Sequence, residues 1–318
     1  AQSQTPESQY AIRRMMQLLV ALAQVPEGVW HLPHPPLVLA VAAVGGGVCL
    51  LQKWPWHLRV WGLPCLLPVF LWQAPKPAWG QFELWAADVG QGNAVLLRTA
   101  NHALLYDTGA KYSETSNVGQ RVLVPLMSSL GIQLDRLMLS HRDSDHTGGT
   151  VAVLAAHPKA DVWSSIEPNH PLALLRPIMR CEAGQRWEWD GVRFEVLHPQ
   201  LSDYVSAVSS NAVSCVLRVD ASQEQKPNFS HDRHAGSALL NGDIEWAQEQ
   251  NLLAQAQLKP VDFFLVPHHG SQTSSSLAFV QASQPRWAVV QAGYLNRYGH
   301  PAAKVGARYQ SLNVPLVQ

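Results

Sequence analysis

The segment Leu137-Met-Leu-Ser-His-Arg-Asp-Ser-Asp-His-Thr-Gly-Gly149 places four ligand-type side chains between two regular elements. Its apolar start, Leu137 to Ser140, predicts a buried strand, and the Ala/Val/Leu run after Gly149 predicts a helix. The polar side chains therefore lie on the turn between the C-terminal end of a strand and the N-terminus of a helix. This is where α/β folds place their binding and catalytic groups.

Those four side chains are two imidazoles and two carboxylates, from His141, Asp143, Asp145 and His146. Packed this densely, they repel and desolvate one another unless a cation lies between them. A polar, glycine-capped loop is the alternative interpretation, and it would be preferred for a single histidine. The density of this tetrad favours a metal site.

The tetrad resembles the His-x-His-x-Asp-His signature of the metallo-β-lactamase superfamily, with Asp143 in place of the second histidine. This variant, followed by Gly-Gly, is similar to the C-terminal domain of the DNA-internalisation competence proteins, the ComEC family. The resemblance implies an α/β fold, namely a metallo-β-lactamase-like four-layer αββα sandwich. Alternating strand and helix patterns after residue 82 are typical of such a layered fold.

Two earlier motifs match the same family. The first is Asp88-Val-Gly-Gln-Gly-Asn-Ala94, in which Asn93 stands where the family has Asp, and the second is Asp107-Thr-Gly109 at the end of a predicted strand. Asp88 and Asp107 are the expected supports of ligand histidines, because a carboxylate behind a metal-bound imidazole fixes its orientation.

Two later motifs complete the predicted metal site. In the superfamily, the Asp of Leu239-Leu-Asn-Gly-Asp-Ile-Glu245 bridges two metals, and the strand-end His before a Gly aligns with His269. Two cations a few Å apart need an anionic bridge. The resemblance thus implies two divalent ions, Zn²⁺ or Mn²⁺, because oxygen-rich ligation is compatible with both. The predicted ligands are His141, Asp143, Asp145, His146, Asp243 and His269.

A third histidine of the superfamily is missing between residues 205 and 214, where Asn211 or Ser210 lies nearest to its place. One metal position is therefore expected to be poorer in nitrogen ligands than usual. His198, beside Pro199 at a predicted strand end, is either a group that approaches the site or an ordinary loop histidine.

The groups expected to act on the substrate follow from the same resemblance. His268 and His300, with Asp145, are the candidate catalytic groups. Arg297 and His300 are candidates for phosphate contact and for protonation of a leaving group. The predicted substrate-binding residues are Arg297, Ser271, Thr273 and Ser274.

The chain is expected to contain two regions, residues 1–75 and residues 82–318, joined by a linker over 76–81. Two apolar runs, Leu37–Leu51 and Val60–Trp72, predict helices in the first region. Each has roughly 15 residues, short of the ~20 that span a bilayer unaided, but flanking Trp side chains can extend them as interfacial anchors. We expect two transmembrane segments, the end of a channel region; the alternative is a buried helical hairpin. Because the chain begins with Ala1 and ends on an apolar run, we also expect it to be part of a longer protein.

Charge gives little guidance on the substrate, since Lys+Arg and Asp+Glu balance at 23 each and no global basic field indicates nucleic acid. The family resemblance implies a metal-dependent phosphodiesterase, a deoxyribonuclease that acts on single-stranded DNA during its uptake, with other competence proteins as partners. The implied location is the inner membrane, with the hydrolase domain on the periplasmic side. The alternatives are a silent module that guides DNA into the channel and a metallo-hydrolase of another ester.

The four cysteines include no Cys-x-x-Cys pair, so a cysteine zinc cluster is unsupported. Cys49 and Cys65 lie in the apolar runs and are predicted to be buried thiols. Cys181 and Cys215 can pair if the domain faces an oxidising compartment, and closing a loop of ~35 residues would contribute roughly 3 kcal/mol. A cytoplasmic domain would leave both reduced.

Overall fold

The computed structural model describes residues 6–23, 33–113, 115–206, 209–222, 236–256 and 258–318. The chain divides into two compact units. One consists of Ala1–Ala74 with Ser128–Gly131, and the other of Pro75–Met127 with Ile132–Gln318.

The first unit is helical. Its helices are α1 (Pro6–Ala23), α2 (Leu37–Leu51), α3 (Trp56–Arg59) and α4 (Gly62–Phe70). Helices α2 and α4 pack against each other through two glycines, because a Cβ on Gly46 would lie 2.6 Å from the Gly62 carbonyl oxygen and one on Gly62 would meet the Gly46 carbonyl in the same way. Any larger residue at either position would push the two helices apart.

The outward faces of α2 and α4 are apolar and exposed. Leu37 and Val38 are each 78% exposed, and Leu51 is 85% exposed. Within the described residues, no helix is long and apolar enough to cross a membrane. The prediction that Cys49 and Cys65 are buried is wrong: the first is half-buried and the second exposed, because the glycine-mediated contact buries only the narrow inner face of the hairpin.

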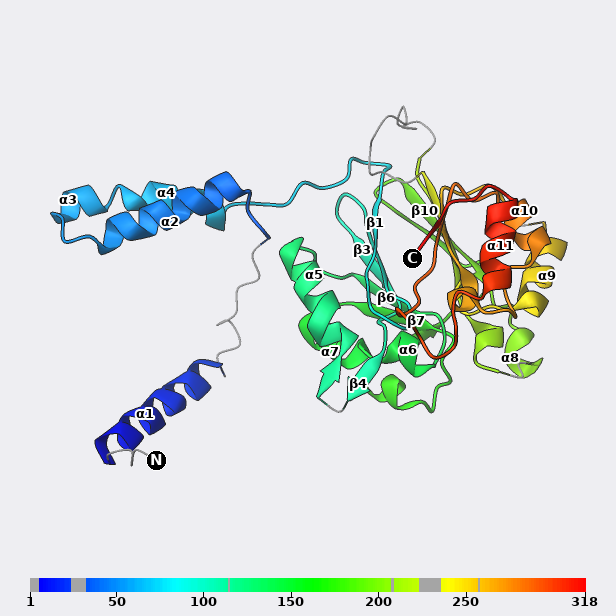
Figure 1. The fold of residues 1–318 in the computed structure, drawn as a ribbon, viewed down its shortest axis with the longest axis horizontal. Coiled ribbons are helices and arrows are strands. Elements are labelled where there is room, and N and C mark those ends of the chain that lie inside the picture. Colours follow the sequence, from blue (N-terminus) through cyan, green and yellow to red (C-terminus); the bar gives the residue numbers. More distant parts are fainter. Residues whose placement is uncertain (1–5, 24–32, 114, 207–208, 223–235, 257) are drawn as a thin grey trace. The chain divides into compact units, whose positions relative to one another are not determined.

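The second unit contains two mixed sheets, which Figure 1 shows packed face to face. The first has the order β1-β2-β3-β6-β7-β8, antiparallel from β1 to β3 and parallel from there on. Its strands are β1 (Glu83–Ala86), β2 (Val95–Arg98), β3 (Ala103–Tyr106), β6 (Arg136–Leu139), β7 (Asp161–Ser164) and β8 (Ile178–Arg180). A separate small hairpin is formed by β4 (Lys111–Ser113) and β5 (Ser116–Asn117).

The second sheet has the order β15-β14-β13-β12-β11-β10-β9. It is antiparallel from β9 to β12 and parallel from β12 to β15. Its strands are β9 (Arg186–Trp189), β10 (Val192–His198), β11 (Val216–Asp220), β12 (Ser237–Leu240), β13 (Phe263–Leu265), β14 (Trp287–Val289) and β15 (Leu316–Val317).

Strand periodicity separates two hydrophobic layers in this unit. On β12, Ala238 and Leu240 point into the core between the sheets, whereas Leu239 points to the opposite face, as expected when successive side chains alternate. Helices α9 (Trp246–Ala254), α10 (Leu277–Ser283) and α11 (Ala303–Ser311) cover that outer face through side chains such as Phe279 and Tyr309.

Helices α5 (Val124–Ser129) and α7 (Thr150–Ala156) lie on the face of the first sheet that is turned away from the second sheet (Figure 1). The remaining short helices are η2 (Gly119–Leu123), α6 (Ser144–Thr147), η3 (Pro171–Leu174), α8 (Asp203–Ser206), η4 (Asn211–Val213) and η6 (Pro267–Gly270). The two sheets with helices on both outer sides are the four-layer αββα arrangement that the resemblance implied.

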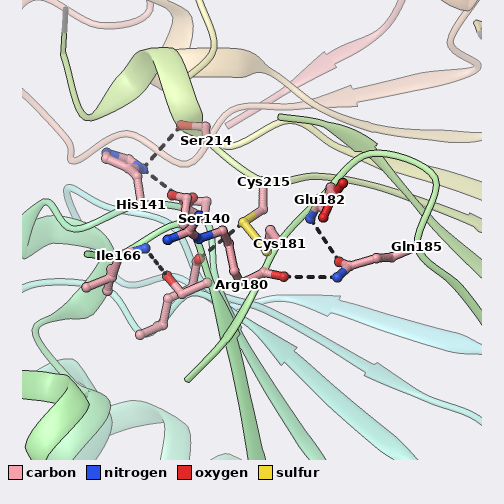
Figure 2. The surroundings of a disulfide bond; sticks show 12 residues. Ser140, His141, Ile166, Arg180, Cys181, Glu182, Gln185, Ser214 and Cys215 are labelled. Carbon is pink, nitrogen blue, oxygen red and sulfur yellow. Dashed lines mark hydrogen bonds between the residues drawn. A yellow bond between two sulfur atoms is a disulfide. The ribbon is translucent and has the colours of Figure 1, made fainter. Parts of the chain in front are cut away.

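A disulfide between Cys181 and Cys215 joins the two sheets, with the Cα atoms 6.0 Å apart. Cys181 directly follows β8 of the first sheet and Cys215 directly precedes β11 of the second. Figure 2 shows the bond beside Ser140 and Ser214, and the Cys215 N–H donates to the Ser140 carbonyl at 2.9 Å. The disulfide favoured from the sequence is thus present, and it lies next to the turn that carries the tetrad.

We predict that removing this crosslink lowers the free energy of unfolding by roughly 3 kcal/mol, because a closed loop of this size restricts the unfolded chain. The test is urea unfolding of the chain with Cys181→Ala and Cys215→Ala, compared with the unchanged chain. Reductant should destabilise the unchanged chain by a similar amount and leave the double variant unaffected. A Cys49→Ala, Cys65→Ala pair serves as the control. Equal stability of the unchanged chain with and without reductant would contradict the prediction.

Candidate metal centre

The first candidate ligand is His146, whose ring is held in place by Asp107. Asp107 follows β3 with a φ of 62° and is fully buried. Its two carboxylate oxygens accept from the Ser140 N–H at 2.7 Å and the Ser140 hydroxyl at 2.8 Å, and one lies 2.8 Å from His146 Nδ1. The Nδ1 side of the His146 ring is thus held by Asp107, and Nε2 faces the other way, where it can bind a metal when it carries no proton. The structure thus places Asp107 where a support of a ligand histidine was predicted.

The second is His269, held by a backbone carbonyl. Its Nδ1 lies 2.8 Å from the Gln291 carbonyl oxygen, so Nδ1 donates and Nε2 again faces the opposite way. The Gln291 side chain is itself fixed across the two sheets. Its amide nitrogen donates to the carbonyls of Ala87 and Ala94, and its oxygen accepts from the Ala94 N–H.

The third is His141, the first residue after the strand that ends at Ser140. Its Nδ1 lies 3.0 Å from the Ser140 hydroxyl and 3.4 Å from the Ser214 hydroxyl. Figure 2 shows the ring between these two serines. His141 Nε2 points away from them, 3.6 Å from an Asp143 oxygen.

Asp243 lies at the centre of the three rings. One of its oxygens is 3.3 Å from His146 Nε2 and 3.4 Å from His269 Nε2. The ligand atoms of His141, His146 and Asp243 all lie within 4.8 Å of one another, and so do those of Asp145, His146 and His269. Two adjacent groups of three ligand atoms, with His146 common to both, provide donors for two neighbouring ions.

The strongest sign that a cation belongs here is a set of buried polar atoms without hydrogen bonds. Among the described residues, Nε2 of His141, His146 and His269 and one oxygen of Asp243 have no hydrogen-bond partner. Leaving one such atom unsatisfied costs about 1–3 kcal/mol, so four together are unfavourable unless something binds them. Imidazole nitrogens and carboxylate oxygens are the donors that Zn²⁺ and Mn²⁺ accept, so these residues fit a divalent metal.

The charges in the cluster support each other even without metal. Burial alone would raise the pKa of Asp243, but the charges of His146 and His269 outweigh it and hold that pKa well below its ordinary value. Burial would lower the pKa of His269, but Asp243 and the hydrogen bond with Asp145 raise it to about 9. Asp243 is therefore ionised, and the positive charge that His146 and His269 carry lies where a metal would otherwise supply it.

The two tetrad carboxylates lie at the rim of the cluster. Asp143 accepts from the Ser210 hydroxyl at 2.6 Å, and its interaction with His141, opposed by burial and helped by Ser210, lowers its pKa to about 2. Asp145 lies 3.3 Å from His269 Nε2. Both are placed as possible ligands. Of Ser210 and Asn211, the two residues nearest to the missing histidine in the sequence, Ser210 is thus the one that contacts a candidate ligand.

Two predicted supporting residues lie elsewhere. Asp88 is exposed and accepts from the Gly90 N–H at 3.2 Å, so it caps its own turn instead of holding a ligand histidine. His198 is buried, and its Nε2 lies 2.9 Å from the Ala212 carbonyl, so that nitrogen is occupied as a donor. His198 therefore supports the turn that carries Ser210 and does not reach the site.

The serine-rich turn after His269 is largely structural, which corrects part of the predicted substrate surface. Ser274 is fully buried and donates to the Pro267 carbonyl at 2.8 Å, and Ser271 is also buried. Only Thr273 of the predicted trio is exposed. Its hydroxyl donates to Glu245 at 2.7 Å.

Glu245 was not singled out from the sequence, yet it orients His268. Its carboxylate lies 3.2 Å from His268 Nδ1, and His268 Nε2 lies 3.9 Å from Asp243. His268 is therefore directed at the cluster from outside, with a carboxylate behind it. The sequence offered one sign of this role, namely that Glu245 lies two residues after Asp243. The contact between Glu245 and His268 could not be predicted, because it depends on the left-handed backbone at His268, with a φ of 51°.

His300 and Arg297 lie beyond the histidines. The His300 ring is stacked on His269 at 6.3 Å between centroids, and it lies 5.9 Å from His268. Burial and the charges of His269 and His268 lower the pKa of His300. The Arg297 guanidinium is fully exposed, 4.9 Å over the ring of Tyr298.

Comparison with known proteins agrees with this geometry. Residues 87–220 match the family profile described as the metallo-beta-lactamase superfamily, whose members are metal-dependent hydrolases. The chain is 36% identical over 308 residues to "Competence protein ComA" of Neisseria gonorrhoeae, a match that covers 95% of this chain and 40% of that protein. The second unit thus has a metallo-β-lactamase fold.

Two further relatives are matched over most of this chain. "Recombination protein 2" of Haemophilus influenzae is 32% identical over 246 residues, which cover 77% of this chain and 28% of that protein. "ComE operon protein 3" of Bacillus subtilis is 30% identical over 273 residues, which cover 78% and 33%. The chain therefore spans less than half the length of each of these relatives.

We predict that Asp107→Asn weakens divalent-metal binding by roughly 10- to 100-fold, because an amide no longer fixes His146 in the tautomer that presents Nε2. The measurement is Zn²⁺ or Mn²⁺ affinity, by competition with a chelator. Asp88→Asn is the matched control, and it should bind metal as the unchanged chain does. Equal losses in the two variants would contradict the roles assigned here to the two carboxylates.

Proposed function

We propose that this metallo-β-lactamase-fold relative of competence proteins is a metal-dependent phosphodiesterase that cleaves DNA during its uptake. The observation that carries the proposal is the buried carboxylate of Asp243, which belongs to one ligand group and lies 3.4 Å from His269 Nε2 of the other. Such a bridge supports two closely spaced ions, and paired ions suit the displacement of one oxygen by another at phosphorus.

Each residue of the cluster has a distinct part in the proposed reaction. A pair of divalent cations, when bound, supplies positive charge that activates water and neutralises an anionic ester. The proposed ligands are His141, Asp143, Asp145, His146, Asp243 and His269. Their donors combine nitrogen and oxygen, which is compatible with either Zn²⁺ or Mn²⁺.

The groups around the ligands are proposed to act on the substrate itself. His268, directed at the cluster and backed by Glu245, is in position to hold or transfer a proton at the reacting oxygen. His300 lies beside it and is the second candidate for that step. Arg297, exposed and always charged, is proposed to bind a phosphate of the bound strand.

The proposed location is the outer face of the inner membrane, next to the DNA channel and its partner competence proteins. Two observations support it. The disulfide between Cys181 and Cys215 is of a kind that persists in oxidising compartments. The apolar exposed faces of α2 and α4 would be compatible with a lipid or protein surface around them.

The test is cleavage of a labelled single-stranded oligodeoxynucleotide by the full chain, with Zn²⁺, Mn²⁺ and Mg²⁺ supplied in turn. Changing a residue that only supports a metal ligand from behind costs up to roughly 100-fold. Asp243→Asn should reduce cleavage by more than this, because it removes the anionic bridge itself. Asp161→Asn is the matched control, since Asp161 pairs with Arg136 and belongs to no ligand group.

Two results would contradict the proposal. Metal-bound chain that binds DNA without cutting it would indicate a guiding module. Cleavage of a lactone or a phosphorylcholine ester, with no action on DNA, would indicate a hydrolase of another ester.

A further inference from the structure

The loop after β14, residues 293–301, presents aromatic side chains that the fold does not use. Tyr294 is 90% exposed, Leu295 84% and Tyr298 54%. Large rings are ordinarily buried or half-buried, because they lose most when left in water. Two tyrosines and a leucine held in solvent within five residues therefore indicate a contact surface.

This loop is held in one shape by the side chain of Asn296. Its amide nitrogen donates to the Gly293 carbonyl at 2.8 Å and to the His300 carbonyl at 2.6 Å. Its oxygen accepts from the Tyr298 N–H at 3.2 Å and the His300 N–H at 3.0 Å. Four hydrogen bonds from one side chain order the loop before any ligand arrives, which lowers the entropy cost of binding.

The exposed rings continue into the metal cluster as a stack. Tyr298 is stacked on His300, with centroids 5.7 Å apart and planes at 26°. His300 is stacked on His269, at 6.3 Å and 19°. The Arg297 guanidinium lies over the ring of Tyr298, 4.9 Å from its centroid. A flat group stacked on Tyr298 would thus take the place of the guanidinium over the ring and leave this cation next to it. The candidate metal ligand His269 lies one ring further on, behind His300.

From this arrangement we infer that Tyr294 and Tyr298 form a stacking platform for the bases of single-stranded nucleic acid, with Arg297 binding the neighbouring phosphate. Rings that accept bases next to a positive group are how proteins hold single strands without reading sequence. Duplex DNA keeps its bases paired and stacked on one another, so it does not offer their faces. The inference rests on the proposed function and adds to it the side chains that would hold the bases of the strand.

The experiment measures binding of the full chain, with chelator present so that nothing is cut. The probes are a fluorescein-labelled oligothymidylate of about 12 nucleotides, an abasic strand of equal length and charge, and a duplex of equal length. Because stacking contributes roughly 1–3 kcal/mol per base, Tyr298→Ala and Tyr294→Ala should each weaken oligothymidylate binding about 5- to 150-fold. Binding of the abasic strand should not change in either variant.

Two control variants separate stacking from other effects. Tyr298→Phe keeps the ring and loses only the hydrogen bond from Arg297, so it should bind oligothymidylate nearly as the unchanged chain does. Trp287→Ala removes a ring that is 47% exposed at the opposite end of β14, and it should have no effect.

Several results would overturn the inference. These are an unchanged affinity in both alanine variants, an equal loss for oligothymidylate and the abasic strand, or no binding of oligothymidylate by the unchanged chain. Failure of the proposed function is a different result, namely strands that bind through the two tyrosines and are not cut when metal is supplied.

Discussion

The carboxylate of Asp243 lies buried between imidazole nitrogens of His146 and His269 that have no hydrogen-bond partner among the described residues, and the rest of the site is arranged around it. A carboxylate in such a place is tolerated only beside positive charge. The charges of His146 and His269 supply it, and they hold the pKa of Asp243 well below its ordinary value. Divalent ions can supply it instead, and each ligand ring is already turned for them by a group behind it: Asp107 for His146 and the Gln291 carbonyl for His269.

This charge balance depends on the packing of two sheets. His141 and His146 follow a strand of the first sheet, whereas Asp243 and His269 follow strands of the second. The sheets are tied together close to the site. The Tyr106 hydroxyl donates to the Cys215 carbonyl at 2.5 Å, the Gln291 side chain hydrogen-bonds the backbone of the first sheet, and the disulfide joins the edge of one sheet to the middle of the other. A small shift between the sheets would separate the ligands.

The four layers and the candidate inner ligands were predicted from short motifs that resemble those of a known superfamily. Each motif follows a predicted strand, and the structure brings His146, Asp243 and His269 together. The wrong predictions are residues that were expected to face the site and instead make local hydrogen bonds. Asp88 was expected to face a histidine and caps its own turn, and Ser274 was expected to meet substrate and is buried. Gln291 was missed because its partners lie about 200 residues away in the chain.

The central claim is that this cluster binds metal at the bridge formed by Asp243, and anomalous X-ray diffraction from a crystal grown with Zn²⁺ or Mn²⁺ tests it most directly. We expect one anomalous peak at about 2.0–2.2 Å from the ligand atoms of His141, His146 and Asp243, with Asp143 nearby. A second peak is expected beside Asp145 and His269, which belong to the other ligand group. A crystal saturated with metal that shows no peak between these side chains, or shows one bound only by surface groups, would contradict the account.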